Sequence, residues 1–260
     1  MHKVLLFLAA ALIGFLPCSG FAAESPAAAP KTPVAANTFT DAQRGEIEII
    51  IRDYLTEKHP EILAQGLQNL QQRDQEAADA KTKEKIASEK DRLFNDSATP
   101  IAGNPKAKVT LLEFYDYLCG YCKMAEDAVE KVLKEDKDVK VVYKNYPILG
   151  PVSLEAAKAG LASVKQGKFQ EFHSALMNKK EHLTSEMIYQ VAKEVGIDVE
   201  KLKKTMGEAS INDAINASLK LGQDLGVRGT PFFIVNSASF PGVLNYEQLK
   251  NAVDAARKAK

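Results

Sequence analysis

The chain has 260 residues, of which 45% are hydrophobic and 26% are charged, and its 34 basic residues balance its 34 acidic residues. A chain without excess charge is a poor match for nucleic acid or for a strongly charged substrate, so we expect no nucleic-acid partner. The length and the apolar content suffice for one well-packed core with a smaller appendage.

The first residues have the pattern of a secretory signal peptide. A short apolar run, residues 4–16, follows Lys3, and this run is too short to span a bilayer. Gly20 and Ala22 satisfy the small-residue rule for cleavage, so we expect residues 1–22 to be removed after Ala22. No later stretch is long and apolar enough to cross a membrane, and we predict a periplasmic location.

Cleavage changes what the three cysteines can do. Cys18 lies in the leader and raises the alternative of a lipidated N-terminus, although Pro17 stands where such a site needs a small residue. Without the leader only Cys119 and Cys122 remain, and the net charge is −1 because Lys3 is lost. Two neighbouring thiols in an exported protein indicate a reaction or a metal rather than a structural disulfide.

Residues 23–39 are rich in alanine and proline and are expected to form a disordered linker. Residues 40–96 then form a predicted N-terminal helical region. Thr40 and Gln43 have the spacing of a capping box, and a helix over residues 41–58 follows them. This helix is expected to end before Pro60, because the residue that precedes a proline avoids helical geometry.

A second predicted helix runs over residues 61–94. Apolar stripes mark the first helix and the start of the second, with Ile47, Ile50, Ile51, Tyr54, Leu55, Ile62, Leu63, Leu67 and Leu70. Residues 71–90 are polar on all sides, which is typical of a solvated connector. Two amphipathic helices make a thin core, so we expect the stripes to pack against another copy in a homo-oligomer, with a dimer favoured.

The second predicted domain spans residues 97–260 and has an α/β pattern. Strands at residues 109–115 and 139–144, joined by a helix at 119–134, form a βαβ unit with parallel strands. A helical insertion of about residues 152–226 follows. The chain then ends with a buried strand at 231–235, a hairpin partner at 239–243 and a last helix.

Cys119 and Cys122 lie where the first strand turns into the helix. Unpaired N–H groups and the positive end of the helix dipole favour a thiolate there. Positions i and i+3 put the two Cα atoms about 5 Å apart, within disulfide reach. Thiol–disulfide exchange needs an exposed thiolate and a second sulfur that displaces the mixed disulfide. We therefore predict the thiolate at Cys119 and a more buried thiol at Cys122.

Glu113 lies on the strand that leads to these cysteines. Alternation puts it on one side of the strand with Leu111 and Tyr115, so a carboxyl group enters one apolar face. One alternative is a surface position on an edge strand. The other is a buried acid with a raised pKa beside a thiol, which is a recurrent functional arrangement. Asp116 is expected to form a turn or a cap.

The motif Cys119-Gly120-Tyr121-Cys122, the helical insertion and Gly229-Thr230-Pro231 ahead of the penultimate strand resemble the DsbA-type branch of the thioredoxin superfamily, over about residues 102–260. The resemblance implies a thioredoxin fold with a helical insertion, preceded here by an N-terminal α-helical extension. It implies that Cys119 attacks, that Cys122 resolves, and that a cis Thr230–Pro231 bond faces them. It also implies that Glu113 takes or relays the proton of Cys122.

The helical extension together with the motif is similar to DsbA-like proteins that dimerise or trimerise through N-terminal helices. Gly120 and Tyr121 are uncharged where DsbA is expected to have a Pro-His pair, so we expect a milder oxidant. The resemblance links threonine at position 230 with isomerases and reductases as much as with oxidases.

These patterns predict a periplasmic thiol–disulfide oxidoreductase that forms, reduces or isomerises disulfide bonds in exported proteins. Its expected partners are unfolded or misfolded substrates and a membrane redox partner of the DsbB or DsbD type, and no cofactor is expected. Two alternatives remain: a Cu(I)- or Zn-binding module that uses Cys119 and Cys122, and a non-catalytic holdase chaperone.

Two further groups of side chains have less definite patterns. Tyr115, Tyr117 and Tyr121 are either core and rim residues or an aromatic lip for unfolded peptide. His59, His173 and His182 are expected to be solvated or locally hydrogen-bonded.

Overall fold

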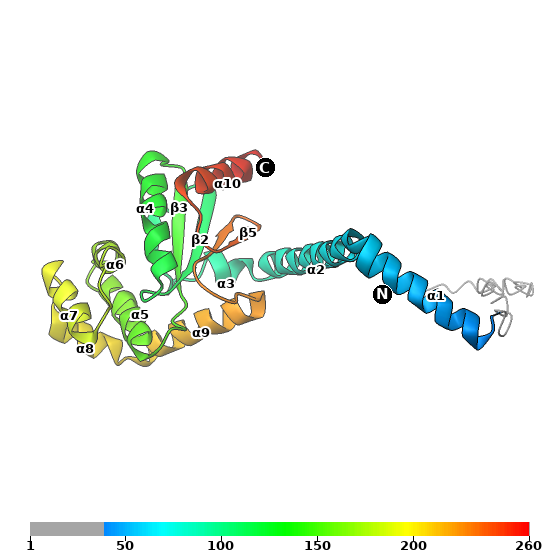
Figure 1. Ribbon diagram of the computed structural model, residues 1–260. Coiled ribbons are helices and arrows are strands. Elements are labelled where there is room, and N and C mark those ends of the chain that lie inside the picture. The colour runs from blue at the N-terminus through cyan, green and yellow to red at the C-terminus, as the bar shows by residue number, and fades with distance from the viewer. Residues whose placement is uncertain (1–38, 260) are drawn as a thin grey trace, which may run out of the picture. The chain divides into compact units, whose positions relative to one another are not determined.

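The computed structural model describes residues 39–259. The predicted leader, residues 1–22, and all but the last residue of the predicted linker, residues 23–39, lie outside the described residues. The chain divides into two compact units, one ending at Gln65 and the other beginning at Gly66 (Figure 1).

The first unit contains α1 (Asp41–Asp53), whose N-terminus has the predicted capping box. The Gln43 N–H donates to the Thr40 hydroxyl at 3.3 Å, and the Thr40 N–H donates to the Gln43 carboxamide at 2.9 Å. The helix continues into a π-helical segment, η1 (Tyr54–Lys58), and ends at His59 as predicted. Most of its large apolar side chains are exposed, namely Ile49, Ile50, Ile51 and Tyr54, whereas Ile47 and Leu55 are half-buried.

The predicted second helix is divided into α2 (Pro60–Ser88) and α3 (Lys90–Phe94). The break is at Glu89, whose φ of −99° and ψ of 15° leave the α-helical region. As the connector prediction requires, residues 71–81 are exposed. Ile86 and Leu93 differ, because they are only 2% and 0% exposed and pack against the sheet. The packed unit therefore includes residues that precede the predicted boundary at residue 97.

Within the described residues, five strands form one sheet in the order β1-β3-β2-β4-β5. The strands are β1 (Ile101–Gly103), β2 (Val109–Tyr115), β3 (Val139–Asn145), β4 (Phe232–Val235) and β5 (Ala238–Pro241). The predicted parallel pairing of β2 with β3 is confirmed, and the other pairs are antiparallel. β1 was not predicted, and the predicted hairpin strand at 239–243 ends earlier, at Pro241.

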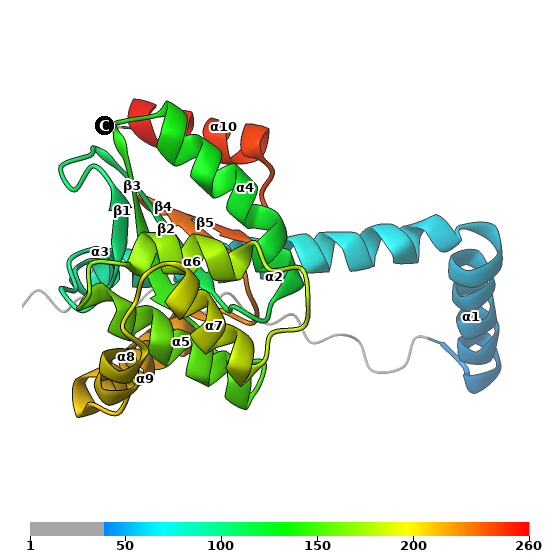
Figure 2. The same ribbon diagram turned by 90° about the vertical axis from the view of Figure 1, so that its left-hand side faces the viewer.

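Helices cover both faces of the sheet. α4 (Gly120–Glu135) packs with α10 (Tyr246–Lys258) on one face, and Figure 2 shows these two helices together on one side of the strands. The predicted insertion consists of α5 (Pro151–Val164), α6 (Phe169–Met177), α7 (Ser185–Glu194), α8 (Val199–Met206) and α9 (Ala209–Leu225). No helix in the described part of the chain combines the length and the apolar character needed to cross a membrane.

The two faces of the sheet bury different clusters, as alternation along β2 requires. Leu111 and Tyr115 belong to the cluster that contains Cys119 and Cys122. The opposite face holds a smaller cluster, made of Ile86, Leu93, Leu112, Phe114, Val142, Tyr146, Leu221, Leu225, Val227, Phe232 and Ile234. The architecture is the predicted thioredoxin fold with a helical insertion and an N-terminal helical extension.

Candidate active site

A tight turn after β2 sets the position of the first cysteine. The Asp116 carboxylate accepts the backbone N–H groups of Leu118 at 2.8 Å, Ile148 at 2.9 Å and Leu149 at 3.1 Å. The Asp116 carbonyl accepts the N–H of Cys119 at 3.0 Å. The turn prediction for Asp116 is confirmed. These bonds place Cys119 at the N-cap of α4, where the helix presents its unpaired N–H groups.

The two cysteines differ in acidity. Both are thiols, with Cys119 7% exposed and Cys122 fully buried. A hydrogen bond from Cys122 lowers the pKa of Cys119 to about 5, with help from the Thr230 side chain and from N–H groups of the first turn of α4. Burial raises the pKa of Cys122 far above its ordinary value, and the hydrogen bond with Cys119 and the charge of Glu113 raise it further. The two pKa values therefore differ in the predicted direction, with the thiolate favoured at Cys119 and the thiol at Cys122.

A loop between α9 and β4 faces Cys119. The Thr230–Pro231 peptide bond is cis, as the resemblance implies. The Cys119 thiol donates to the Thr230 carbonyl oxygen at 3.2 Å, and the Pro231 carbonyl accepts the N–H of Gly242 at 2.9 Å. Residues more than 100 positions apart in the chain thus meet at one sulfur atom.

Glu113 occupies the interior of the sheet. It pairs in register with Tyr143 of β3 and Phe233 of β4, and its side chain is buried without a hydrogen-bond partner on either carboxyl oxygen. Burial raises the pKa of Glu113 well above its ordinary value, and the negative charges of Glu126 and Cys119 add to the effect. The buried position is confirmed over the surface alternative, whereas its role in proton transfer stays a prediction.

Comparison with known proteins identifies the family. A family model described as the DSBA-like thioredoxin domain matches residues 110–254, more than half of the chain. The chain belongs to the DsbA-like thioredoxin domain family. The matched region contains both cysteines, Glu113 and the cis proline loop.

Solved structures of similar proteins include other members with this fold. A thioredoxin-like oxidoreductase from Silicibacter pomeroyi DSS-3 is 43% identical, with a TM-score of 0.64, over 65% of this chain and 98% of that one. ScsC of Proteus mirabilis in a transitional conformation is 31% identical, with a TM-score of 0.63, over 86% of this chain and 99% of that one. The second match also extends over the N-terminal helices.

The curated relatives differ in how much of their length is matched. Disulfide bond formation protein D of Bacillus subtilis is 29% identical over 62% of this chain and 78% of its own length. The first relatives matched are Na(+)/H(+) antiporters NhaA of Salinispora species, and the chain spans only 24% of their length. The match to disulfide bond formation protein D agrees with membership of the DsbA-like family.

The DsbA-like domain contains a buried polar cluster that sequence reasoning missed. His173 is fully buried and hydrogen-bonded, so the solvated alternative is wrong for this residue. Its Nε2 lies 3.3 Å from Oε2 of Glu126, and its Nδ1 lies 3.1 Å from the Tyr117 hydroxyl. Both residues follow the buried stripes of their helices, since Glu126 is four positions after Cys122 and His173 is four after Phe169. This spacing is the signal that could have identified them.

Of the three tyrosines near the motif, two are core residues and one is at the surface. Tyr115 and Tyr117 are buried, and their rings meet edge-to-face at 5.1 Å between centroids. Tyr121 is 65% exposed and stands between the two cysteines in the sequence. Only Tyr121 therefore presents an aromatic ring at the surface beside the motif.

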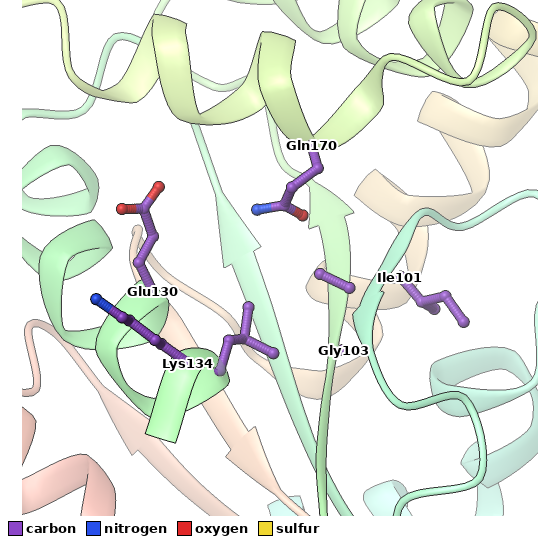
Figure 3. A pocket seen from close by; sticks show the side chains of 7 residues that line it. Ile101, Gly103, Glu130, Lys134 and Gln170 are labelled. Atoms are coloured by element: carbon purple, nitrogen blue, oxygen red, sulfur yellow. The ribbon is translucent and has the colours of Figure 1, made fainter. Parts of the chain in front are cut away.

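Two further features bear on the metal and ligand alternatives. Within residues 39–259, no group of three or more His, Cys, Asp or Glu side chains could hold a metal ion. A cavity of about 440 Å³ lies between β1, α4 and α6, and Figure 3 shows Glu130 and Lys134 of α4 and Gln170 of α6 around it. Its lining includes no residue of the cysteine motif or the cis proline loop, so it is separate from the candidate active site.

Proposed function

We propose that this protein is a periplasmic thiol–disulfide oxidoreductase that acts on exported proteins through Cys119 and Cys122. The observation that carries the proposal is the acidic Cys119 thiol at the start of α4, held 3.2 Å from the Thr230 carbonyl and backed by the non-acidic thiol of Cys122. Membership of the DsbA-like family supports it.

In the reducing direction, the Cys119 thiolate attacks one sulfur of a substrate disulfide. The substrate S–S bond breaks, a mixed disulfide forms, and the second substrate sulfur leaves as a thiolate that takes up a proton. Cys122 then gives its proton to ionised Glu113 and attacks Cys119, so the protein disulfide forms. The first substrate sulfur leaves and takes the proton from Glu113. The substrate has gained two electrons, and the protein dithiol has lost them.

The same steps in reverse oxidise a substrate dithiol. If another thiol of the substrate displaces Cys119 from the mixed disulfide, the substrate disulfide is isomerised without net electron transfer. A pKa of about 5 for Cys119 lies between the values of about 7 and about 3.5 that are typical of thioredoxin and DsbA. It supports a milder oxidant than DsbA, in agreement with the uncharged Gly120-Tyr121 pair. A membrane partner of the DsbB type would remove two electrons from the pair, and one of the DsbD type would supply them.

We further assign a homo-oligomer, with a dimer favoured, to residues 40–96. The support is the row of exposed apolar side chains on α1 and the first turns of α2, since large exposed apolar patches mark interaction sites. The organisation then comprises a leader (1–22), a linker (23–39), this oligomerisation region and the DsbA-like domain (97–260), with Ile86 and Leu93 of the oligomerisation region packed on that domain.

The test uses two substitutions in the full mature chain. Cys119→Ser is expected to abolish reduction of a model protein disulfide, because the attacking sulfur is lost, while circular dichroism stays unchanged. Cys122→Ser is expected to trap the mixed disulfide, which non-reducing gels and mass spectrometry detect. An unchanged reduction rate in Cys119→Ser would refute the assignment of Cys119 as the attacking sulfur. If the unmodified protein reduced no disulfide, the holdase alternative would remain.

A further inference from the structure

A groove of about 610 Å³ lies beside the candidate active site, within the second unit of the chain. One wall is the part of α2 between residues 75 and 85, and the other consists of the loop between α9 and β4 together with β5. Figure 1 shows α2 running past β5 and the end of α9. Thr230 and Pro231 line the groove, and the Thr230 carbonyl contacts Cys119 at 3.2 Å. The groove is therefore lined in part by the residue whose carbonyl contacts the reactive sulfur.

The part of α2 that forms one wall contacts the end of α9 and the loop that follows it. The Lys85 ammonium donates to the carbonyl oxygen of Asp224, at the end of α9. Ile86 is buried in one cluster with Val227 and Phe232, which flank the cis proline on either side. The position of this part of α2 is thus tied to the residues around Thr230 and Pro231.

The charges that line the groove are mostly positive. Lys81, Lys85 and Arg228 contribute three cations, and Asp79 contributes one anion, which accepts from Gln75 at 2.8 Å. Within residues 39–259, Lys81 and Arg228 are exposed and have no ion-pair partner. Apolar atoms complete the lining, from Ala78, Leu225, Pro231, Phe232 and Pro241. The groove thus offers apolar contact and two unpaired cations.

We propose that this groove binds the polypeptide that flanks a substrate cysteine, with α2 as one wall, and that Lys81 and Arg228 select segments with an acidic residue there. The proposal rests on the proposed thiol–disulfide exchange. The volume lies in the range of ordinary ligand sites. Because each exposed ion pair contributes little, the expected preference is about threefold for each cation at low salt.

The test measures how fast the oxidised, full mature protein reacts with three single-cysteine peptides of equal length. The peptides carry Glu, Gln or Lys on both sides of the cysteine. The variants are Lys81→Glu and Arg228→Glu, and the matched control is Lys83→Glu, which makes the same charge change on the exposed side of α2 away from the groove. Dividing each variant's Glu-to-Lys rate ratio by that of the unmodified protein cancels the intrinsic reactivity of the peptides.

We expect each of the two groove variants to lower the Glu-to-Lys ratio at least threefold, and Lys83→Glu to leave it within about 1.5-fold. The preference should shrink in 0.5 M NaCl, because salt screens exposed charges. An equal effect of Lys83→Glu, or no effect of Lys81→Glu, would overturn the proposal. Failure of the unmodified protein to react with any peptide would instead refute the proposed function, so the two failures are distinguishable.

Discussion

At the scale of single residues, two identical side chains acquire opposite acidity from their places on one helix. Cys119 stands at the N-cap of α4, where N–H groups and neighbouring side chains donate to its sulfur. Cys122 lies one turn inside, in the apolar cluster and near the negative charge of Glu113. Desolvation acts against both thiolates, but only Cys119 receives enough hydrogen bonds to overcome it.

This difference predicts a pH profile for alkylation of the reduced protein. The rate at Cys119 should rise with pH through a midpoint of about 5 and be flat between pH 7 and 9, because only the thiolate reacts. Cys122 should stay unmodified over this range, since its pKa is raised. Mass spectrometry after timed exposure to iodoacetamide measures both rates. A rate at Cys119 that keeps rising steeply from pH 7 to 9 would contradict the assignment.

The same pKa links redox state to stability. The thiolate is favoured by folding, because its folded pKa of about 5 lies below the ordinary value of 9.0. The reduced form therefore has this stabilisation in full above pH 9 and loses it as the pH falls towards 5. The oxidised form has no ionisable thiol and lacks the dependence.

The sequence predicted both cysteines, the turn at Asp116 and the side on which Glu113 is buried, because each follows from short-range geometry. It did not predict the buried pair of His173 and Glu126. Charged and imidazole side chains are usually solvated, and the two residues lie 47 positions apart. Only the packing of α6 on α4 brings them together.

At the scale of elements, α2 changes character along its length. Its residues before Lys85 are mainly exposed, whereas Ile86 and, beyond the break, Leu93 are buried against the sheet. Helical spacing predicted the helix, but not the break at Glu89, where the sequence has neither proline nor glycine. β1 was missed for a similar reason: it has three residues, and its pairing with the distant β3 defines it.

Replacing Ile86 with alanine tests how much the packing of α2 on the sheet stabilises the protein. Ile86→Ala should lower the free energy of unfolding by about 2–4 kcal/mol, because it leaves a cavity in a closed cluster. The matched control is Ile148→Ala, where the side chain is 43% exposed and a loss below about 1 kcal/mol is expected. Urea unfolding of each variant measures both values. Equal losses would mean that α2 is not packed on the domain as described.

At the scale of the whole molecule, the residues proposed to bind a second copy of the chain are distinct from those that pack on the catalytic domain. A mature chain beginning at Gln71 loses the exposed apolar side chains of α1 and α2 but keeps Ile86, Leu93 and the wall of the groove. We expect it to sediment as a monomer, to remain folded and to react with small disulfides. The unmodified chain should sediment as an oligomer. The same subunit number for both would refute association through this region.

A chain beginning at residue 97 is a useful comparison, because this is the boundary that the sequence predicted. It lacks Ile86 and Leu93, so Leu112, Phe114 and Ile234 lose part of their cover. Such a chain should be less stable than the one beginning at Gln71. The turn-forming residues at positions 95–105 correctly predicted where the preceding helices end. They do not indicate which apolar side chains of those helices reach the sheet, because that depends on how the helices pack.

The tyrosines around the motif have an optical consequence. The protein has eight tyrosines and no tryptophan, so its ultraviolet emission comes from tyrosine alone. Tyr121 stands between the two sulfurs in sequence, and Tyr115 and Tyr117 pack in the same cluster as the cysteines. A disulfide quenches a nearby phenol more strongly than two thiols do. The emission therefore reports the oxidation state of the pair without an added label, in a protein where no indole masks it.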